Sequence, residues 1–304
     1  MRVVTSGSAY LDIDAYACCI AYAEWLNLTG VDARAVSSAQ PNASVSATVL
    51  GWNKHFDDYI PRADDEFVVM DVSDYHYFDP MVKLDRVVEV IDHHPGFEAY
   101  WAETLGPNAD IRPIGAAATQ VFQRWESSGL LPHISAQSAA LLATAILDNT
   151  LCFTGLRSTD EDLRAFEVLR PLAGLASDWP ERYFLECQAA IEADLPVALV
   201  ADLKIMRPQS NLPQVFAQMA VWNAEALVQQ HRSAMSRWLS AQGDDWILNI
   251  ISIGEAKSYL LVEPVVSQHK LSRLLQVDCQ PGLVVVEPPL LRKELLSMGL
   301  ALNR

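Results

Sequence analysis

The first two hundred residues alternate short, continuous apolar runs with longer segments in which apolar residues recur at helical spacing. The runs are rich in valine and too short for buried helices, so they are predicted to be buried strands. The predicted elements are strands at residues 2–5, 67–71 and 87–91, and helices at residues 14–28, 116–127 and 135–147. Because parallel strands need crossover connections, this alternation predicts an α/β fold with helices on both faces of a parallel sheet.

The pattern changes after a predicted helix at residues 179–192. The later elements are strands at residues 215–219, 246–253, 258–262 and 282–287, and helices at residues 222–242 and 269–275. An order in which several strands follow one another is typical of a smaller α+β domain. We therefore expect an α/β domain over residues 1–190 and an α+β domain over residues 197–304.

Polar residues with metal-binding side chains follow the predicted elements of the first domain. They are Asp12 and Asp14 after the first strand, Asp71 at the end of the second, Asp92, His93 and His94 after the third, and Asp148 at the end of the apolar helix. A single aspartate at such a place is more often a turn or cap residue. Since ligands gather beyond the carboxyl ends of parallel strands, four such segments together predict a site for divalent cations.

The overall charge argues against several classes of function. The 304 residues carry 38 acidic and 22 basic side chains, a net charge of −16, whereas a protein that binds duplex nucleic acid needs a cationic face. A small anionic substrate remains compatible with this charge if metal ions or a few converging cations neutralise it. No apolar run reaches the ~18 residues of a membrane span and no signal peptide precedes the first strand, so we expect a cytoplasmic protein that does not bind membranes.

The triplet Asp92-His93-His94 resembles the motif that gives the DHH phosphoesterases their name. Other motifs of that superfamily have counterparts in the same order along the chain. These counterparts are Asp12-Ile13-Asp14, Asp71, Ile146-Leu147-Asp148-Asn149-Thr150, Thr159 with Asp162, Asp202-Leu203-Lys204 and Leu291-Arg292-Lys293-Glu294. The last two are similar to segments of the branch that contains manganese-dependent (family II) inorganic pyrophosphatases, short-chain exopolyphosphatases and prune-like proteins.

The resemblance extends over nearly the whole chain and implies a role for each of these residues. It implies an N-terminal DHH domain that binds metals, a C-terminal domain that binds substrate, and an active site in the cleft between them. The implied metal ligands are Asp12, Asp14, Asp71, His93 and Asp148. The implied substrate-binding residues are His94, Lys204, Arg292 and Lys293. Asp71 and Asp148 would bridge two metal ions and act in catalysis with His94, while Asp92 would orient a histidine.

At one position the chain departs from the pyrophosphatases that it resembles. Those enzymes have a metal-binding histidine four residues before the first motif aspartate, where this chain has Ser8. Exopolyphosphatases and prune-like proteins also lack this histidine. A site without this nitrogen ligand favours Mg²⁺ more than the site of a pyrophosphatase does. His93 still supplies one nitrogen, which keeps the site suitable for Mn²⁺. We therefore expect two or more divalent ions, Mn²⁺ or Mg²⁺, with Co²⁺ as a further option.

The resemblance implies a hydrolase that cleaves a phosphoanhydride bond of short-chain polyphosphate or pyrophosphate with a metal-activated water. Two alternatives stay open at this point. The chain could be a phosphodiesterase for cyclic or short nucleotides, or a catalytically weakened relative that binds a phosphorylated ligand or a protein partner. The sequence also leaves open whether the protein is a homodimer.

Overall fold

The computed structural model describes residues 1–52 and 55–303. They form two compact units, residues Met1–Tyr183 and Phe184–Arg304. The division falls inside helix α7 (Trp179–Ala193), while the boundary expected from the sequence lies a few residues later, at 190–197. Each unit has its own sheet and its own hydrophobic core.

The first unit contains the parallel sheet that the sequence predicts. Its strands are β1 (Arg2–Thr5), β2 (Ala33–Ala35), β3 (Glu66–Met70), β4 (Val87–Asp92) and β5 (Ala109–Ile111). They lie in the order β2-β1-β3-β4-β5, and all neighbouring pairs are parallel. The sequence does not predict β2 and β5, because an edge strand of three residues is too short to show a recognisable pattern.

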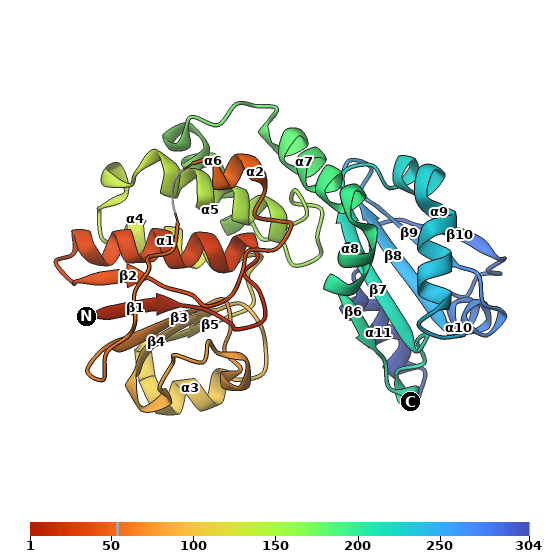
Figure 1. Ribbon diagram of the computed structural model, residues 1–304, viewed down its shortest axis with the longest axis horizontal. Helices are drawn as coiled ribbons and strands as arrows, with labels where there is room; N and C mark the ends of the chain where they lie inside the picture. Colours follow the sequence, from red (N-terminus) through yellow and green to blue (C-terminus); the bar gives the residue numbers. More distant parts are fainter. Residues whose placement is uncertain (53–54, 304) are drawn as a thin grey trace. The chain divides into compact units, whose positions relative to one another are not determined.

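Helices cover both faces of this sheet (Figure 1). The helices of the first unit, besides the start of α7, are α1 (Ile13–Leu28), α2 (Ala47–Leu50), α3 (Glu98–Leu105), α4 (Ala117–Ser127), α5 (Ala136–Asn149) and α6 (Asp160–Ala173). Figure 1 shows α1, α4 and α5 above the strands and α3 below them. α1 is buried along nearly its whole length, because it packs against both the sheet and α5.

The core on the α3 side of the sheet fixes the segment that follows β3. Phe67 and Val69 of β3 belong to the same cluster as Trp101 of α3, whose side chain is fully buried. The Trp101 indole Nε1 donates a hydrogen bond to the carbonyl of Ser73 at 2.7 Å. Since truncating a buried tryptophan costs roughly 3–5 kcal/mol, α3 holds the chain firmly just beyond Asp71.

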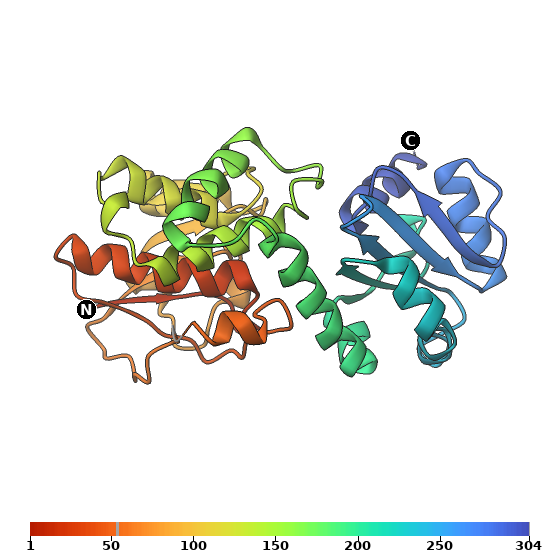
Figure 2. The ribbon, with the colours of Figure 1, turned by 90° about the horizontal axis from the view of Figure 1, so that it is seen from above.

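The second unit contains a mixed sheet with helices on both faces. Its strands are β6 (Leu203–Ile205), β7 (Val215–Val221), β8 (Trp246–Ser252), β9 (Lys257–Val262) and β10 (Gly282–Val286). Its helices beyond α7 are α8 (Leu195–Ala201), α9 (Ala224–Ser240), α10 (Val265–Leu275) and α11 (Arg292–Ala301). In the order β10-β9-β8-β7-β6, β7 and β8 are parallel and the other pairs antiparallel. α8 and α9 pack on one face and α10 and α11 on the other (Figure 2).

Short 3₁₀ helices occur in the connections. They are η1 (Tyr75–Tyr77), η2 (Leu84–Arg86), η3 (Gly106–Asn108), η4 (Leu131–His133) and η5 (Pro208–Ser210). Two long apolar α-helices, α1 and α5, have 16 and 14 residues, fewer than the ~20 that a membrane span needs. Across residues 1–52 and 55–303, no helix combines the length and the apolar character that crossing a membrane requires.

A buried aspartate fixes the loop that precedes α4. Asp162, in the first turn of α6, accepts hydrogen bonds from the amide of Gly115 at 3.0 Å and from the hydroxyl of Thr119 at 2.5 Å. It also accepts from the amide and the hydroxyl of Thr159, the residue that caps α6, at 2.8 and 2.7 Å. These donors compensate for removing the carboxylate from water, so Asp162 ties α6 to the loop before α4.

Gly115→Ala is expected to destabilise the first unit, because a Cβ at this position would lie 2.7 Å from Asp162 Cγ and 2.8 Å from Thr150 Cγ2. The Asp162 carboxylate cannot move away without losing its donors. We expect a loss of about 1–3 kcal/mol in the free energy of unfolding, measured by urea denaturation. Gly243→Ala is the matched control, since its Cβ meets Val215 Cγ2 at an ordinary 3.5 Å. Equal losses in both variants would contradict the steric argument.

Candidate active site

Asp71 and the triplet at residues 92–94 lie side by side because β3 and β4 are neighbouring parallel strands. Met70 pairs with Ile91 at the ends of these strands, so the residues that follow emerge at the same edge of the sheet. The Asp71 amide donates to the carbonyl of Ile91 at 2.8 Å. Its φ of 59° is in the left-handed region, a conformation that is uncommon for a residue other than glycine and recurs at functional sites.

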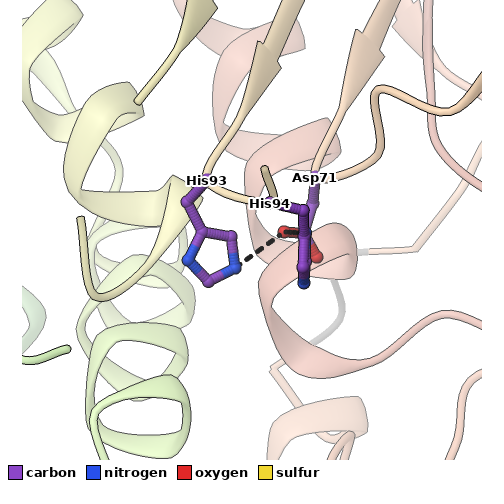
Figure 3. A group of neighbouring side chains, drawn as sticks. All are labelled: Asp71, His93 and His94. Carbon is purple, nitrogen blue, oxygen red and sulfur yellow. Dashed lines mark ion pairs between the residues drawn. The ribbon is translucent and has the colours of Figure 1, made fainter. Parts of the chain in front are cut away.

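Figure 3 shows Asp71, His93 and His94 gathered at the ends of β3 and β4. Asp71 Oδ1 lies 3.3 Å from His93 Nε2 and 3.8 Å from His94 Nδ1. One potential ligand atom from each of the three residues lies within 4.8 Å of the others. Nitrogen and oxygen atoms gathered in this way are the ligands that divalent transition metals prefer.

His93 turns its Nε2 toward the carboxylates. Its Nδ1 donates to the carbonyl of Ile114 at 3.0 Å, which leaves Nε2 as the nitrogen that faces the carboxylates, 3.3 Å from Asp71 and 3.9 Å from Asp14. Among the described residues, neither Asp71 Oδ1 nor His93 Nε2 has a hydrogen-bond partner. Two buried polar atoms without hydrogen-bond partners are unfavourable unless a cation or a shared proton lies between them. A divalent metal ion fits this arrangement, and the Ile114 contact is of the kind that orients a metal-binding histidine.

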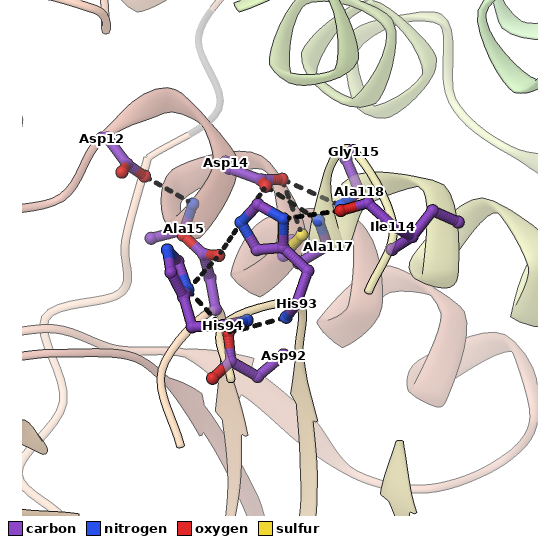
Figure 4. Close-up of polar contacts among 12 residues, drawn as sticks. Asp12, Asp14, Ala15, Asp92, His93, His94, Ile114, Gly115, Ala117 and Ala118 are labelled. Atoms are coloured by element: carbon purple, nitrogen blue, oxygen red, sulfur yellow. Dashed lines mark hydrogen bonds and ion pairs between the residues drawn. The ribbon is translucent and has the colours of Figure 1, made fainter. Parts of the chain in front are cut away.

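Asp12 and Asp14 join the cluster from the N-terminus of α1 (Figure 4). Asp12 caps this helix, because its Oδ1 accepts from the amide of Ala15 at 2.9 Å. The fully buried Asp14 accepts from the amides of Ala117 and Ala118, both at 2.8 Å. These amides belong to the first turn of α4, and the N-terminus of a helix stabilises an anion. The two bonds therefore offset part of the cost of burying Asp14.

Asp148 lies at the end of α5 and is held by a tyrosine. Tyr183 Oη lies 2.9 Å from Asp148 Oδ1 and 2.8 Å from the carbonyl of Ser44. Burial raises the pKa of Asp148 to about 7; the Tyr183 bond opposes this shift, and the charges of Asp12 and Asp14 add to it. Asp148 is therefore within electrostatic reach of both aspartates of the first motif.

The carboxylates of the cluster oppose one another's ionisation. Burial raises the pKa of Asp71 well above the ordinary range, and the charges of Asp14 and Asp12 raise it further. Burial also raises the pKa of Asp14, although His93 and the α4 amides oppose the shift. Like charges that gather away from water need a counter-charge. The electrostatics of the cluster, like its geometry, fit bound divalent cations.

Asp92 orients His94. Its Oδ1 accepts from His94 Nδ1 at 2.8 Å and from the amides of His93 and His94 at 2.7 and 3.0 Å. Partial burial of the ring lowers the pKa of His94, but the bond to Asp92 and the charge of Asp71 outweigh this effect and raise the pKa overall. Because Nδ1 is bonded to Asp92, Nε2 is the nitrogen left for a substrate, and the His94 side chain is 59% exposed.

The three predicted substrate-binding cations of the second unit line one pocket. Lys204 of β6 and Arg292 and Lys293 of α11 surround a cavity of ≈ 370 Å³ together with Gln218. The Arg292 guanidinium pairs with the carboxylate of Asp202 and donates to the Asp202 carbonyl at 2.9 Å. The Arg292 amide also donates to Gln218 Oε1 at 2.6 Å. The pocket thus gathers positive charge on a chain that is acidic overall.

The sequence-predicted site residues form two groups, one in each unit. The group in the first unit is Asp12, Asp14, Asp71, His93, His94 and Asp148, and the group in the second is Lys204, Arg292 and Lys293. Their roles as ligands and substrate contacts stay predictions. The sequence did not reveal the contact of Tyr183 with Asp148, because the helix that contains Tyr183 was predicted from apolar spacing alone. It also did not reveal the roles of the Ile114 carbonyl and the α4 amides, because backbone groups carry no sequence signal.

No family model matches the chain. It is similar to the probable manganese-dependent inorganic pyrophosphatases of an Exiguobacterium species, at 29% identity over 208 residues (66% of this chain and 63% of the relative), and of Bacillus pumilus, at 30% over 205 residues (66% and 64%). The manganese-dependent inorganic pyrophosphatase of Bacillus subtilis is 26% identical over 205 residues (66% and 64%). The chain thus spans slightly less than two thirds of the length of these curated relatives.

Two solved structures share the fold over nearly the whole chain. A putative family II inorganic pyrophosphatase from Methanococcus jannaschii superposes with a TM-score of 0.69 at 19% identity, covering 98% of this chain and 99% of its own. An exopolyphosphatase-related protein from Bacteroides fragilis superposes with a TM-score of 0.53 at 16% identity, covering 99% and 92%. The relatives support the resemblance to the DHH phosphoesterase superfamily that the motifs indicate, and the two solved structures share the fold of the chain.

Proposed function

We propose that this chain is a metal-dependent phosphohydrolase that cleaves phosphoanhydride bonds of short-chain polyphosphate or pyrophosphate. The observation that carries the proposal is the pair of buried atoms without hydrogen-bond partners, Asp71 Oδ1 and His93 Nε2, which face each other at 3.3 Å inside a cluster of carboxylates. The relatives named manganese-dependent inorganic pyrophosphatases support the same class of reaction.

The proposed metal ligands are Asp12, Asp14, Asp71, His93 and Asp148, with Asp71 and Asp148 as bridges. Two or more divalent ions, Mn²⁺ or Mg²⁺, would supply positive charge to the phosphate oxygens and lower the pKa of the attacking water. The chain itself orients the ligands, because Tyr183 holds Asp148 and the α4 amides hold Asp14. Ligands that are oriented in advance need little rearrangement when a cation binds.

We assign His94 to the leaving group. Its Nδ1 is engaged by Asp92, so its Nε2 can donate a hydrogen bond or a proton to the oxygen that departs from phosphorus. The raised pKa of His94 increases the fraction of protonated ring near neutral pH. The large exposed fraction of the side chain leaves it accessible to a substrate.

We assign Lys204, Arg292 and Lys293 to the substrate phosphates. Catalysis of phosphoryl transfer is mainly positioning and neutralisation of charge, and three cations around one pocket suit both tasks. The contacts of Arg292 with Asp202 use its two Nη groups. Its Nε–H and the outer Nη hydrogens therefore remain for phosphate oxygens.

Ser8 bears on the choice between substrates. Its exposed side chain follows β1, and its amide donates to the carbonyl of Tyr77 at 2.9 Å, so the backbone at this position is fixed. A serine hydroxyl is a poor ligand beside an imidazole, so a metal ion near it would be held by carboxylates and water. Positions filled by water leave room for a longer phosphate chain, and we therefore propose short polyphosphate ahead of pyrophosphate.

Asp71→Asn is expected to lower the turnover number by about two to three orders of magnitude, because it removes a charge that faces the proposed cations. Thermal denaturation should show that the variant remains folded. Asp74→Asn is the matched control, since Asp74 follows the same strand but pairs with His76, at 2.7 Å, outside the cluster. Near-normal activity of Asp71→Asn at saturating metal would exclude Asp71 as a bridging ligand.

Arg292→Ala and Lys293→Ala are expected to reduce kcat/KM about tenfold to a hundredfold, the range that corresponds to one lost charge-assisted contact. Metal affinity, measured by titration calorimetry, should stay close to the wild-type value because these side chains are assigned to the substrate. Arg273→Ala, an exposed arginine on α10 of the same unit, serves as the control. A loss of metal affinity as large as the loss of activity would refute this assignment.

A phosphate-release panel tests the proposed reaction. Pyrophosphate, tripolyphosphate, longer polyphosphate and cyclic AMP would each be assayed with Mg²⁺, Mn²⁺ and Co²⁺. We expect faster hydrolysis of tripolyphosphate than of pyrophosphate, and substantial activity with Mg²⁺, because Ser8 supplies no nitrogen ligand. A protein that hydrolyses cyclic AMP and no phosphoanhydride would replace this proposal by the phosphodiesterase alternative.

The Ser8→His variant, assayed in the same panel, tests whether Ser8 sets the preference for metal and substrate. The variant is expected to bind Mn²⁺ more tightly and to shift the activity ratio toward pyrophosphate, because an imidazole replaces water as a ligand. Ala9→His adds the same side chain at the exposed neighbouring position and should change neither property. If wild-type protein is fastest on pyrophosphate with Mn²⁺ and Ser8→His has no effect, Ser8 does not set the specificity.

A further inference from the structure

A pocket in the first unit is lined by the two histidines of the triplet, His93 and His94. It has a volume of ≈ 470 Å³, and its lining includes His93, His94, Leu156, Arg112 and Arg157. A volume of this size corresponds to roughly fifteen water molecules in the liquid, which exceeds the space that one phosphate group fills. The functional assignments above use the two histidines and leave the rest of this pocket without a role.

The two arginines of the pocket differ in what they contact. Arg112 Nε donates to Asp110 Oδ1 at 2.8 Å, and its guanidinium lies 3.7 Å from Glu161 Oε2. The exposed Arg157 has neither an ion pair nor a hydrogen bond to its guanidinium within the part of the chain that the structure describes. Arg157 is therefore the cation of this pocket whose charge is available to a ligand.

The loop that carries Arg157 connects α5, which contains Asp148, to α6. It starts just after Asp148, and Ser158 is anchored by its amide to Gly155 at 2.9 Å and by its hydroxyl to the carbonyl of Thr150 at 3.1 Å. The next residue, Thr159, caps α6. The backbone is thus fixed on the C-terminal side of Arg157 while the guanidinium itself remains uncommitted.

The pocket is not uniformly positive. Glu98 also lines it, and its Oε2 accepts from the amide of Gly96 at 2.9 Å. An anion that enters beside His94 is therefore repelled near Glu98 and attracted toward Arg157. The planar guanidinium of an arginine matches the oxygens of a phosphate group in a bidentate contact.

We propose that this pocket is a subsite for a further phosphate group of the substrate, beyond the two that flank the cleaved bond, and that Arg157 binds this group. The proposal rests on the proposed phosphohydrolase function and deepens it. Arg157 then selects chains of three or more phosphates over pyrophosphate, because pyrophosphate has no group that reaches this subsite.

Steady-state kinetics of Arg157→Ala test the subsite. We expect kcat/KM for tripolyphosphate to fall about tenfold more than kcat/KM for pyrophosphate, because one charge-assisted contact is lost only with tripolyphosphate. The change should appear mainly in KM. Arg157→Lys should retain part of the preference. Arg182→Ala, an exposed arginine of the same unit that lies near Asp178, is the control. Equal losses for both substrates, or no loss, would overturn the subsite.

ADP, assayed with the same variants, distinguishes a phosphate from an organic group in the pocket. A larger loss for ADP than for tripolyphosphate would mean that the pocket accommodates a nucleoside, and it would overturn the proposal as stated. Calorimetric binding of tripolyphosphate and pyrophosphate to Asp71→Asn, with and without Arg157→Ala, supplies a readout apart from turnover. If wild-type protein hydrolyses no phosphoanhydride, the proposed function fails. The binding data then test the subsite separately: it is supported if Arg157→Ala weakens the binding of tripolyphosphate but not that of pyrophosphate. It is refuted if Arg157→Ala leaves the binding of both unchanged or weakens both equally.

Discussion

Mutual repulsion among buried carboxylates is the constraint on which the first unit depends. Burial raises the pKa of Asp14, Asp71 and Asp148, and the charge of Asp12 raises all three further. The charge of Asp14 adds to the shifts of Asp71 and Asp148. A protein does not gather such groups without a compensating charge. The amides at the start of α4 supply part of this compensation for Asp14, and His93 turns its Nε2 toward Asp71 and Asp14. The gathered carboxylates are therefore electrostatically unfavourable without a bound cation.

Negative and positive side chains gather at different places in the two units. Carboxylates gather where the strands of the first sheet end, and cations gather around β6 and α11 of the second unit. Most of these charged groups have a contact that fixes their position: Arg292 with Asp202, His94 with Asp92, and Asp148 with Tyr183. Groups that are positioned in advance lose little conformational entropy when a ligand binds, which suits the proposed catalysis by positioning.

The parts of the fold that the sequence predicts are those with a strong local pattern. β3 and β4 are largely apolar runs that are followed by residues able to bind metals. The sequence alone therefore predicts that Asp71 and His93 lie at one edge of the sheet. The edge strands β2 and β5 have three residues each and no such pattern. Contacts over long separations were equally invisible: nothing in the local sequence links Tyr183 to Asp148, 35 residues earlier.

The bonds that assemble the cluster join residues that are distant along the chain. Asp162 reaches Gly115 across 47 positions, and Asp14 reaches Ala117 across 103. Closing loops of this length opposes folding entropically, so such contacts form late. A cation that binds the proposed set of ligands consequently recognises the native state after α1, α4 and α6 have docked. Metal binding should thus prolong the lifetime of the folded protein by slowing its unfolding, while it leaves the rate of folding almost unchanged.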